Sequence, residues 1–354
     1  MGMPSISITF SEIASTAIKR GERGIIAMIL KDSNVPEKNP VVCMTVADIP
    51  ETLSAESKEQ ITLALMGYVN SPKKVIAYVL SEVAENYTEA LDYFKTVKFD
   101  YLVAPKCDTD GMGTTIVSYV KAERSAGKLI KAVLPCVKAD NEGIINYTTG
   151  TVYTSDKEYT AEEYYSRIAG ISDRTPLQYS CTYAPLAELI DCTRLNKEDM
   201  DKAVDAGELF VWWDGEKVKI SRGVNSLTTL TNGKGSQFKK IKILDAIDMI
   251  SNDIRMTCQD FYIGKFANTY DNKCLLLSAI GNYFDQLILD DVLQSYELVI
   301  DIDANRTFLR DKGIDVDSMS DDDIKKANTG SNVFLKASLN ILDAIEDIVI
   351  PISI

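Results

Sequence analysis

The segment Cys107–Gly113, with the sequence CDTDGMG, contains residue types that bind phosphates in many nucleotide-binding proteins. A glycine-rich turn between a strand and a helix presents backbone N–H groups to phosphate oxygens. The dinucleotide fingerprint GxGxxG is broken here, because Ile116 stands where the third glycine should be. Asp108 and Asp110 would also repel a phosphate, and no GxxxxGK[ST] motif occurs. The segment therefore predicts a strand-to-helix turn and no nucleotide site.

A second segment resembles the start of a calcium-binding loop. Asp301, Asp303 and Asn305 have the spacing of its first three ligands. Such a loop has glycine at its sixth position and glutamate at its twelfth, where this chain has Arg306 and Lys312. We therefore expect no metal at these residues, and we predict no cofactor for the chain.

The absence of histidine from the sequence narrows the possible enzyme chemistry. It excludes Ser-His and Cys-His nucleophiles, histidine zinc sites and the usual general base near neutral pH. The 52 Asp and Glu residues give many chance carboxylate pairs for glycoside hydrolysis. Trp212 and Trp213 could stack on a sugar, but neighbouring strand residues point to opposite faces. An α/β hydrolase that acts through carboxylates remains open as an alternative.

The length and charge of the chain limit its partners. Its 354 residues suit about two domains, and a hydrophobic content of 45% can fill their cores. The net charge of −14 repels phosphate backbones, so we expect no nucleic-acid partner. No signal peptide and no membrane span are expected from the apolar pattern. The seven cysteines lack CxxC spacing, which is typical of reduced thiols in the cytoplasm.

Short apolar runs alternate with helical patterns through the first half of the chain. This alternation predicts an α/β domain with a largely parallel sheet. The expected strands are 24–30, 74–80, 99–104 and 129–137, and 144–154 is expected to be a strand or ribbon. The expected helices are 52–69, 87–97, 114–126 and 161–168.

The second half has a different pattern. A helix over 196–206 and a hairpin turn at Asp214-Gly215 precede a Thr-, Asn-, Gly- and Ser-rich stretch, where we place a domain boundary. Beyond this boundary we expect helices over 238–262, 274–293 and 321–327, and strands over 296–303 and 333–341.

Both ends of the chain have the pattern of strands outside the domain bodies. At each end, alternate residues are apolar and share one strand face: Ile6, Ile8 and Phe10, and then Ile348, Ile350, Ile352 and Ile354. Pro351 suits an edge or an added strand, since it cannot donate to a ladder. Such a strand must pair with its own body or with another molecule. Pairing between molecules would give a head-to-tail polymer.

Lys239, Lys240 and Lys242 form the one compact basic cluster of this acidic sequence. A solvated helix start and a contact to an acidic partner are both consistent with it.

Several segments together resemble contractile-tail sheath proteins. Arg222–Leu230 (RGVNSLTTL) follows a hairpin with the sequences VWWDG and VKI, and it carries much of the likeness. Gly24–Met28, PKKV at 72–75 and IEDIVIP at 345–351 extend it over nearly the whole chain. The sequence is most similar to the short-sheath branch found in some phages, defective prophages and R-type bacteriocins of the diffocin kind.

The resemblance implies a subtilisin-like sheath-type α/β domain, a C-terminal α+β domain and extended terminal strand arms. We assign the N-terminal arm to residues 1–20, the α/β domain to 21–235, the α+β domain to 236–344 and the C-terminal arm to 345–354. The name subtilisin-like describes architecture only, because a chain without histidine cannot form a serine-protease triad.

The resemblance also implies a structural role without enzyme activity. Sheath subunits form stacked hexameric rings around a tail tube, and they pass from a metastable extended state to a shorter, wider one that drives the tube through a cell envelope. Exchanged terminal strands link neighbouring subunits in this family. The C-terminal domain faces the tube, which makes Lys239, Lys240 and Lys242 possible tube contacts here.

The implied partners are other copies of the chain, a tail tube protein, and baseplate and tail-terminator proteins, with no nucleic acid and no membrane insertion. The protein would be made in the bacterial cytoplasm and end in a virion tail or bacteriocin particle. A non-contractile phage structural or adaptor protein with the same strand exchange is a further alternative.

Overall fold

The computed structural model describes residues 17–21 and 23–354, which separate into two compact units. Unit 1 contains the described residues up to Gly21 and Ile250–Leu342. Unit 2 contains the rest, up to Met249, together with Asp343–Ile354. The predicted N-terminal strand residues Ile6, Ile8 and Phe10 lie outside the described residues. The domain boundaries assigned from the sequence remain predictions.

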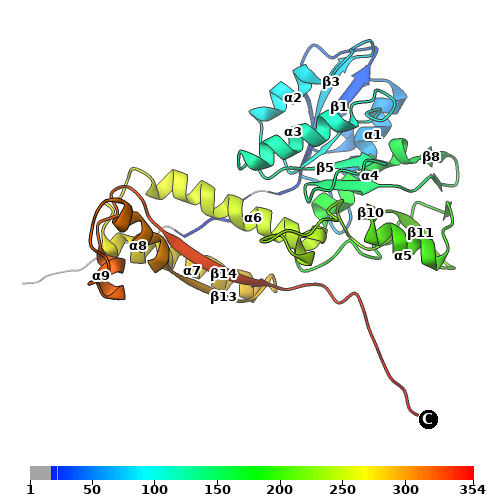
Figure 1. The fold of residues 1–354 in the computed structure, drawn as a ribbon. Helices are drawn as coiled ribbons and strands as arrows, with labels where there is room; N and C mark the ends of the chain where they lie inside the picture. Colours follow the sequence, from blue (N-terminus) through cyan, green and yellow to red (C-terminus); the bar gives the residue numbers. More distant parts are fainter. Residues whose placement is uncertain (1–16, 22) are drawn as a thin grey trace, which may run out of the picture. The chain divides into compact units, whose positions relative to one another are not determined.

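Unit 2 is built around a seven-stranded sheet with the order β10-β6-β5-β4-β1-β3-β2 (Figure 1). Its ladders are parallel except for the one between β2 and β3. Its central strands are buried along nearly their whole length, because helices flank a parallel sheet on both faces. The strands are β1 (Ile25–Asp32), β2 (Val41–Cys43), β3 (Lys74–Ser81), β4 (Tyr101–Val103), β5 (Lys131–Pro135), β6 (Ile144–Tyr147) and β10 (Glu208–Leu209).

Four helices pack against this sheet. They are α1 (Ala55–Leu65), α2 (Thr88–Lys95), α3 (Gly113–Ser125) and α4 (Ala161–Arg174), and a short 3-10 turn, η1 (Val46–Asp48), precedes them. Helices α1 and α4 pack against each other and against β1. This contact needs Gly170, since a Cβ there would lie 2.3 Å from the carbonyl oxygen of Ala64.

Smaller elements of unit 2 follow the main sheet. A three-stranded antiparallel sheet consists of β7 (Thr151–Tyr153), β8 (Glu158–Thr160) and β9 (Asp191–Cys192). Helix α5 (Lys197–Asp205) comes before the hairpin of β11 (Val211–Trp213) and β12 (Val218–Ile220). A 3-10 turn, η2 (Ser236–Lys239), leads into α6 (Ile241–Thr257), whose residues from Ile250 belong to unit 1.

Unit 1 is an α+β unit. A π-helical turn, η3 (Cys258–Tyr262), ends α6, and α7 (Tyr270–Leu289) packs on β13 (Leu293–Ile300). Helices α8 (Ile302–Asp311) and α9 (Asp321–Lys326) contact each other and precede β14 (Leu335–Ile341), which pairs antiparallel with β13. Every helix in the described part of the chain is too short or too polar to span a bilayer.

The predicted fold class is confirmed, with changes at particular elements. The segment 144–154, expected as a strand or ribbon, contains two strands, β6 and β7, in different sheets. The helix expected over 238–262 is divided into a 3-10 turn, an α-helix and a π-turn. The strand expected over 296–303 ends at Ile300, because Asp301 caps α8 by accepting a hydrogen bond from the Ala304 N–H at 2.9 Å.

Buried ion pairs attach the first part of α6 to the sheet. Lys131 on β5 places its ammonium 2.9 Å from Asp245 and 3.1 Å from Asp248, both on α6. Arg124 on α3 binds Asp248 at 2.9 Å, and Arg23 binds Asp245 at 3.0 Å. Burial alone would lower the pKa of Lys131, but the two carboxylates raise it above its ordinary value. The lysine therefore stays charged inside the core.

Asp173 on α4 is buried without such partners. It is 2% exposed, and neither of its carboxylate oxygens has a hydrogen-bond partner among the described residues. Burial, together with the nearby charge of Asp100, raises the pKa of Asp173 well above its ordinary value, although Arg23 opposes this. The folded protein therefore favours the neutral acid.

Replacing Asp173 with Asn should stabilise the protein, and the gain should grow with pH. The unfolded chain releases this proton near pH 4, whereas the folded protein keeps it to a higher pH. The wild type therefore loses stability as pH rises above about 4, by up to ~1.4 kcal/mol per unit, and the variant does not. Urea unfolding at about pH 5.5, 6.5 and 7.5 measures the difference.

The matched control is Asp156→Asn in an exposed turn, which should show no such pH-dependent gain. An Asp173→Asn protein that is no more stable than the wild type at any of these pH values would contradict this account of the buried carboxyl.

Candidate functional site: the C-terminal root

Residues Asp343–Asp347, which we name the C-terminal root, lie against the body of unit 2. Glu346 is the buried member, with its side chain 6% exposed. Its carboxylate accepts hydrogen bonds from the hydroxyls of Ser180 at 3.0 Å and Thr182 at 2.5 Å. Arg222 and Lys240 each place a nitrogen 3.4 Å from the same carboxylate. Two hydroxyls and two cations thus converge on one acid.

Two further carboxylates of the root pair with the same cations. Asp343 binds Lys240 and Asp347 binds Arg222, and both pairs are more exposed than Glu346. The hydrogen bond from Arg222 to Asp347 is the main effect that raises the guanidinium pKa. Burial would lower the pKa of Lys240, but Asp343 and Glu346 raise it above its ordinary value. Both basic side chains are therefore held charged against the root.

The body presents these groups through close local packing. The Thr182 hydroxyl oxygen accepts a hydrogen bond from the Gly223 N–H at 2.9 Å. A Cβ at Gly223 would lie 2.8 Å from the Cys181 sulfur, so only glycine allows this approach. Arg222, directly before Gly223, is thereby held beside the segment that carries Ser180 and Thr182.

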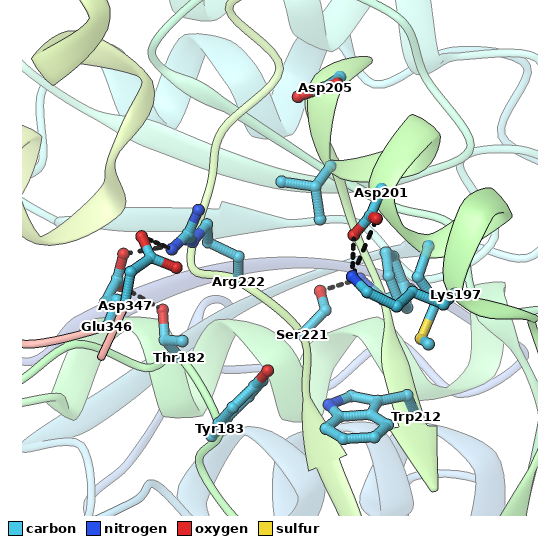
Figure 2. Close-up of a pocket in the computed structure, with 13 residues that line it drawn as sticks. Thr182, Tyr183, Lys197, Asp201, Asp205, Trp212, Ser221, Arg222, Glu346 and Asp347 are labelled. Carbon is cyan, nitrogen blue, oxygen red and sulfur yellow. Dashed lines mark hydrogen bonds and ion pairs between the residues drawn. The ribbon is translucent and has the colours of Figure 1, made fainter. Parts of the chain in front are cut away.

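A cavity of about 650 Å³ adjoins the root (Figure 2). Figure 2 shows Glu346 and Asp347 beside Arg222 and Thr182, with Lys197 and Asp201 of α5 elsewhere in the lining. Lys197 and Asp201 pair with each other at 3.0 Å, so their charges are already matched. The arrangement can hold a carboxylate-bearing segment in place.

The four C-terminal isoleucines follow the root directly. Residues 348–354, which we name the terminal segment, include Ile348 and Ile350, exposed at 71% and 72%, and Ile352 and Ile354, which are also exposed. No strand forms there in the single chain. A strand needs a ladder partner, so their role in linking subunits remains a prediction.

The three lysines of the basic cluster have different surroundings. Lys240 holds the root, as described above. Lys242 on α6 is 7% exposed, and burial lowers its pKa. Lys239 is half-buried at the end of η2. Whether any of them contacts a tail tube remains a prediction.

The Cys107–Gly113 turn, rejected as a phosphate site, has internal partners. Glu162 accepts hydrogen bonds from the Asp108 and Thr109 N–H groups at 2.8 and 2.9 Å, so a carboxylate of the chain itself occupies the amides of the turn. Asp110 pairs with Lys31 at 3.0 Å. No cluster of three or more His, Cys, Asp or Glu residues suited to a metal occurs in the described part of the chain.

Sequence reasoning missed Ser180, Thr182 and the anchoring role of Glu346. Glu346 and Arg222 belong to segments that carry the family resemblance, but no spacing rule connects residues so far apart in the sequence. The sequence offered one signal for this site: three acids, Asp343, Glu346 and Asp347, lie close together just before the apolar end of the chain.

Comparisons with known proteins identify the fold and the family. Residues 82–226 match the phage tail sheath protein central domain, and residues 233–354 match the phage tail sheath C-terminal domain. The chain is 39% identical over 354 residues to a tail sheath protein of Clostridium phage phiCD119, covering 98% of each chain.

Solved sheath structures share the fold. The sheath tail protein of Desulfitobacterium hafniense aligns with a TM-score of 0.72 and 20% identity over 84% of this chain and 94% of that one. The contracted helical sheath of the anti-feeding prophage aligns with a TM-score of 0.73 and 13% identity over 100% and 99% of the two chains.

These matches define a structural protein of contractile systems and not an enzyme. The chain belongs to the phage tail sheath protein family.

Proposed function

We propose that copies of this chain form stacked hexameric rings around a tail tube and contract from an extended state to drive the tube through a cell envelope. The family membership and the likeness to sheaths solved in a contracted state support this proposal. Its partners would be other copies of the chain, a tail tube protein, and baseplate and tail-terminator proteins. The protein would be made in the bacterial cytoplasm and act in a virion tail or bacteriocin particle.

The observation that carries the proposal is the exposure of the terminal segment. Seven residues, IVIPISI, lie outside the body although five of them are Ile or Val. An apolar segment of this kind gains free energy by pairing with another sheet, at roughly 1.5–3 kcal/mol for each isoleucine that becomes fully buried. The segment is thus suited to strand addition to a neighbouring copy.

The hairpin of β13 and β14 offers an edge that could receive such a strand. The two strands form a sheet of two, and neither has a second ladder partner among the described residues. Their residues are mostly exposed or half-buried. Because two-stranded sheets are marginal alone, an added strand from another copy would stabilise this one.

Deleting residues 347–354 should leave the body folded and abolish polymerisation. The deletion removes the exposed pair of Asp347 with Arg222 and seven residues that are exposed in the single chain, so it takes little from the stability of the body. Negative-stain microscopy for tubes or rings and thermal unfolding of the soluble protein together measure the two effects. Normal tubes from the truncated chain would disprove the linking role, and an unfolded monomer would show that the segment belongs to its own core.

The tube contact is a separate proposal and now concerns Lys239 most directly, since Lys240 and Lys242 are engaged within the subunit. Exposed ion pairs contribute only ~0–1 kcal/mol each, but repetition around a ring multiplies the effect. Lys239→Glu should reduce copolymerisation with the tube protein and leave sheath-only polymer unchanged. Lys217→Glu in the exposed hairpin turn is the charge-matched control. Equal tube binding by both variants would show that Lys239 is a solvated side chain and not a tube contact.

Contraction should need no nucleotide. The turn at Cys107–Gly113 already binds the Glu162 carboxylate, and the favourable free-energy change would come from contacts between subunits. Mild urea, acid or heat should therefore contract assembled tails in nucleotide-free buffer, as seen by electron microscopy. Contraction that stops without ATP and resumes on its addition would contradict this expectation.

A further inference from the structure

We propose that Glu346 is a positioning residue, which fixes to the body of unit 2 the point where the terminal segment begins. The inference rests on the proposed function, in which the terminal segment links subunits. It assigns to one side chain the control of how far that segment reaches. It rests on the contacts of the C-terminal root.

Glu346 differs from the other acids of the root in burial and in partners. Its side chain is 6% exposed, compared with 81% for Asp347. It receives two hydroxyl hydrogen bonds and lies near two cations, and hydrogen bonds to a charged acceptor are stronger than neutral ones. The Asp347 side chain is open to solvent and that of Asp343 is about one-third exposed, so salt screens both pairs more than the contacts of Glu346. Glu346 therefore contributes most to holding the root.

Two of the cations that hold the root are accessible to water when the root is released. Arg222 and Lys240 are about one-third exposed at their side chains, so water can solvate both when Glu346 is absent. Ser180 and Thr182 also hydrogen-bond to each other at 2.8 Å. Release of the root therefore leaves neither of these two cations buried without solvent, whereas Lys242, which is 7% exposed, loses the nearby charges of Asp343 and Glu346.

The held root sets the length of the free chain. The last backbone hydrogen bond of the hairpin unit is from the Leu342 N–H to the Val292 carbonyl, at 2.9 Å. With Glu346 bound, residues 348–354 are free and span at most about 25 Å. Without it, residues 343–354 are free and span about 40 Å, and the effective concentration for linking falls about twofold. The root thus makes the terminal segment a short tether that moves with unit 2.

Backbone ¹⁵N relaxation of the deuterated full-length protein tests the assignment. In the wild type, the order parameters of the Glu346 and Asp347 amides should be about 0.85, whereas those of residues 350–354 should be below about 0.6. In Glu346→Ala, the amides of residues 344–347 should also fall below about 0.6, with the thermal unfolding midpoint unchanged. Ile345→Ala, at a neighbouring side chain that is 88% exposed, is the matched control and should keep the root ordered.

A graded variant separates positioning from a general loss of structure. Glu346→Gln keeps an oxygen that accepts from Ser180 and Thr182 but loses its charge, so the order of its root should be intermediate between those of the wild type and Glu346→Ala. Unchanged order in Glu346→Ala, or equal loss in Ile345→Ala, would overturn the proposal. If the linking function alone were wrong, Glu346→Ala would still release the root while deletion of residues 347–354 left polymerisation intact. If only the positioning role of Glu346 were wrong, the deletion would block polymerisation while the root stayed ordered in Glu346→Ala.

Discussion

The burial of Asp245 and Asp248 on α6 is the constraint on which the rest of unit 2 depends. Two carboxylates inside a core are tolerable only with cations beside them, and Lys131, Arg124 and Arg23 supply these from three other parts of the chain. Removing one partner from such a network typically costs about 3–5 kcal/mol, because a buried charge is left without compensation. The pairs therefore fix where α6 starts relative to the sheet.

The two regions to which we assign roles in assembly have opposite chemistry. The root is held by charged groups and hydroxyls, and contacts between charged groups weaken in salt. The terminal segment is mostly apolar and has no charged side chain from Ile348 onward. A polar attachment followed by an apolar end is suited to our proposal, in which the segment stays with its own body at one end and pairs with another molecule at the other.

The sequence predicted the elements whose burial is uniform. Strands such as β1 and β3 are continuous apolar runs, and these are typical of a sheet covered on both faces. The end of β13 could not be predicted from alternation, because Leu298, Ile300 and Ile302 keep the strand pattern while the side chain of Asp301 starts a helix. Here one local hydrogen bond decides between two structures that the apolar pattern allows equally.

The site was less predictable than the fold. The apolar terminal segment could be identified from its alternating isoleucines, but the root could not, since Arg222 and Asp347 are 125 residues apart. In a chain with 52 acidic and 38 basic residues, charge alone does not say which pairs form. The same reason explains why the lysine cluster could not be divided from the sequence into Lys240, which holds the root, and Lys242, which is buried.

The most direct test of the account is a cryo-EM reconstruction of the polymer formed by the full-length chain, at a resolution that traces the backbone. We expect residues 348–354 of each copy to lie as an added strand on the sheet of a neighbouring copy, with Glu346 still bound to Arg222 and Lys240 of its own copy. A polymer in which this segment is unpaired, or folded back on its own body, would contradict the claim that it links the subunits.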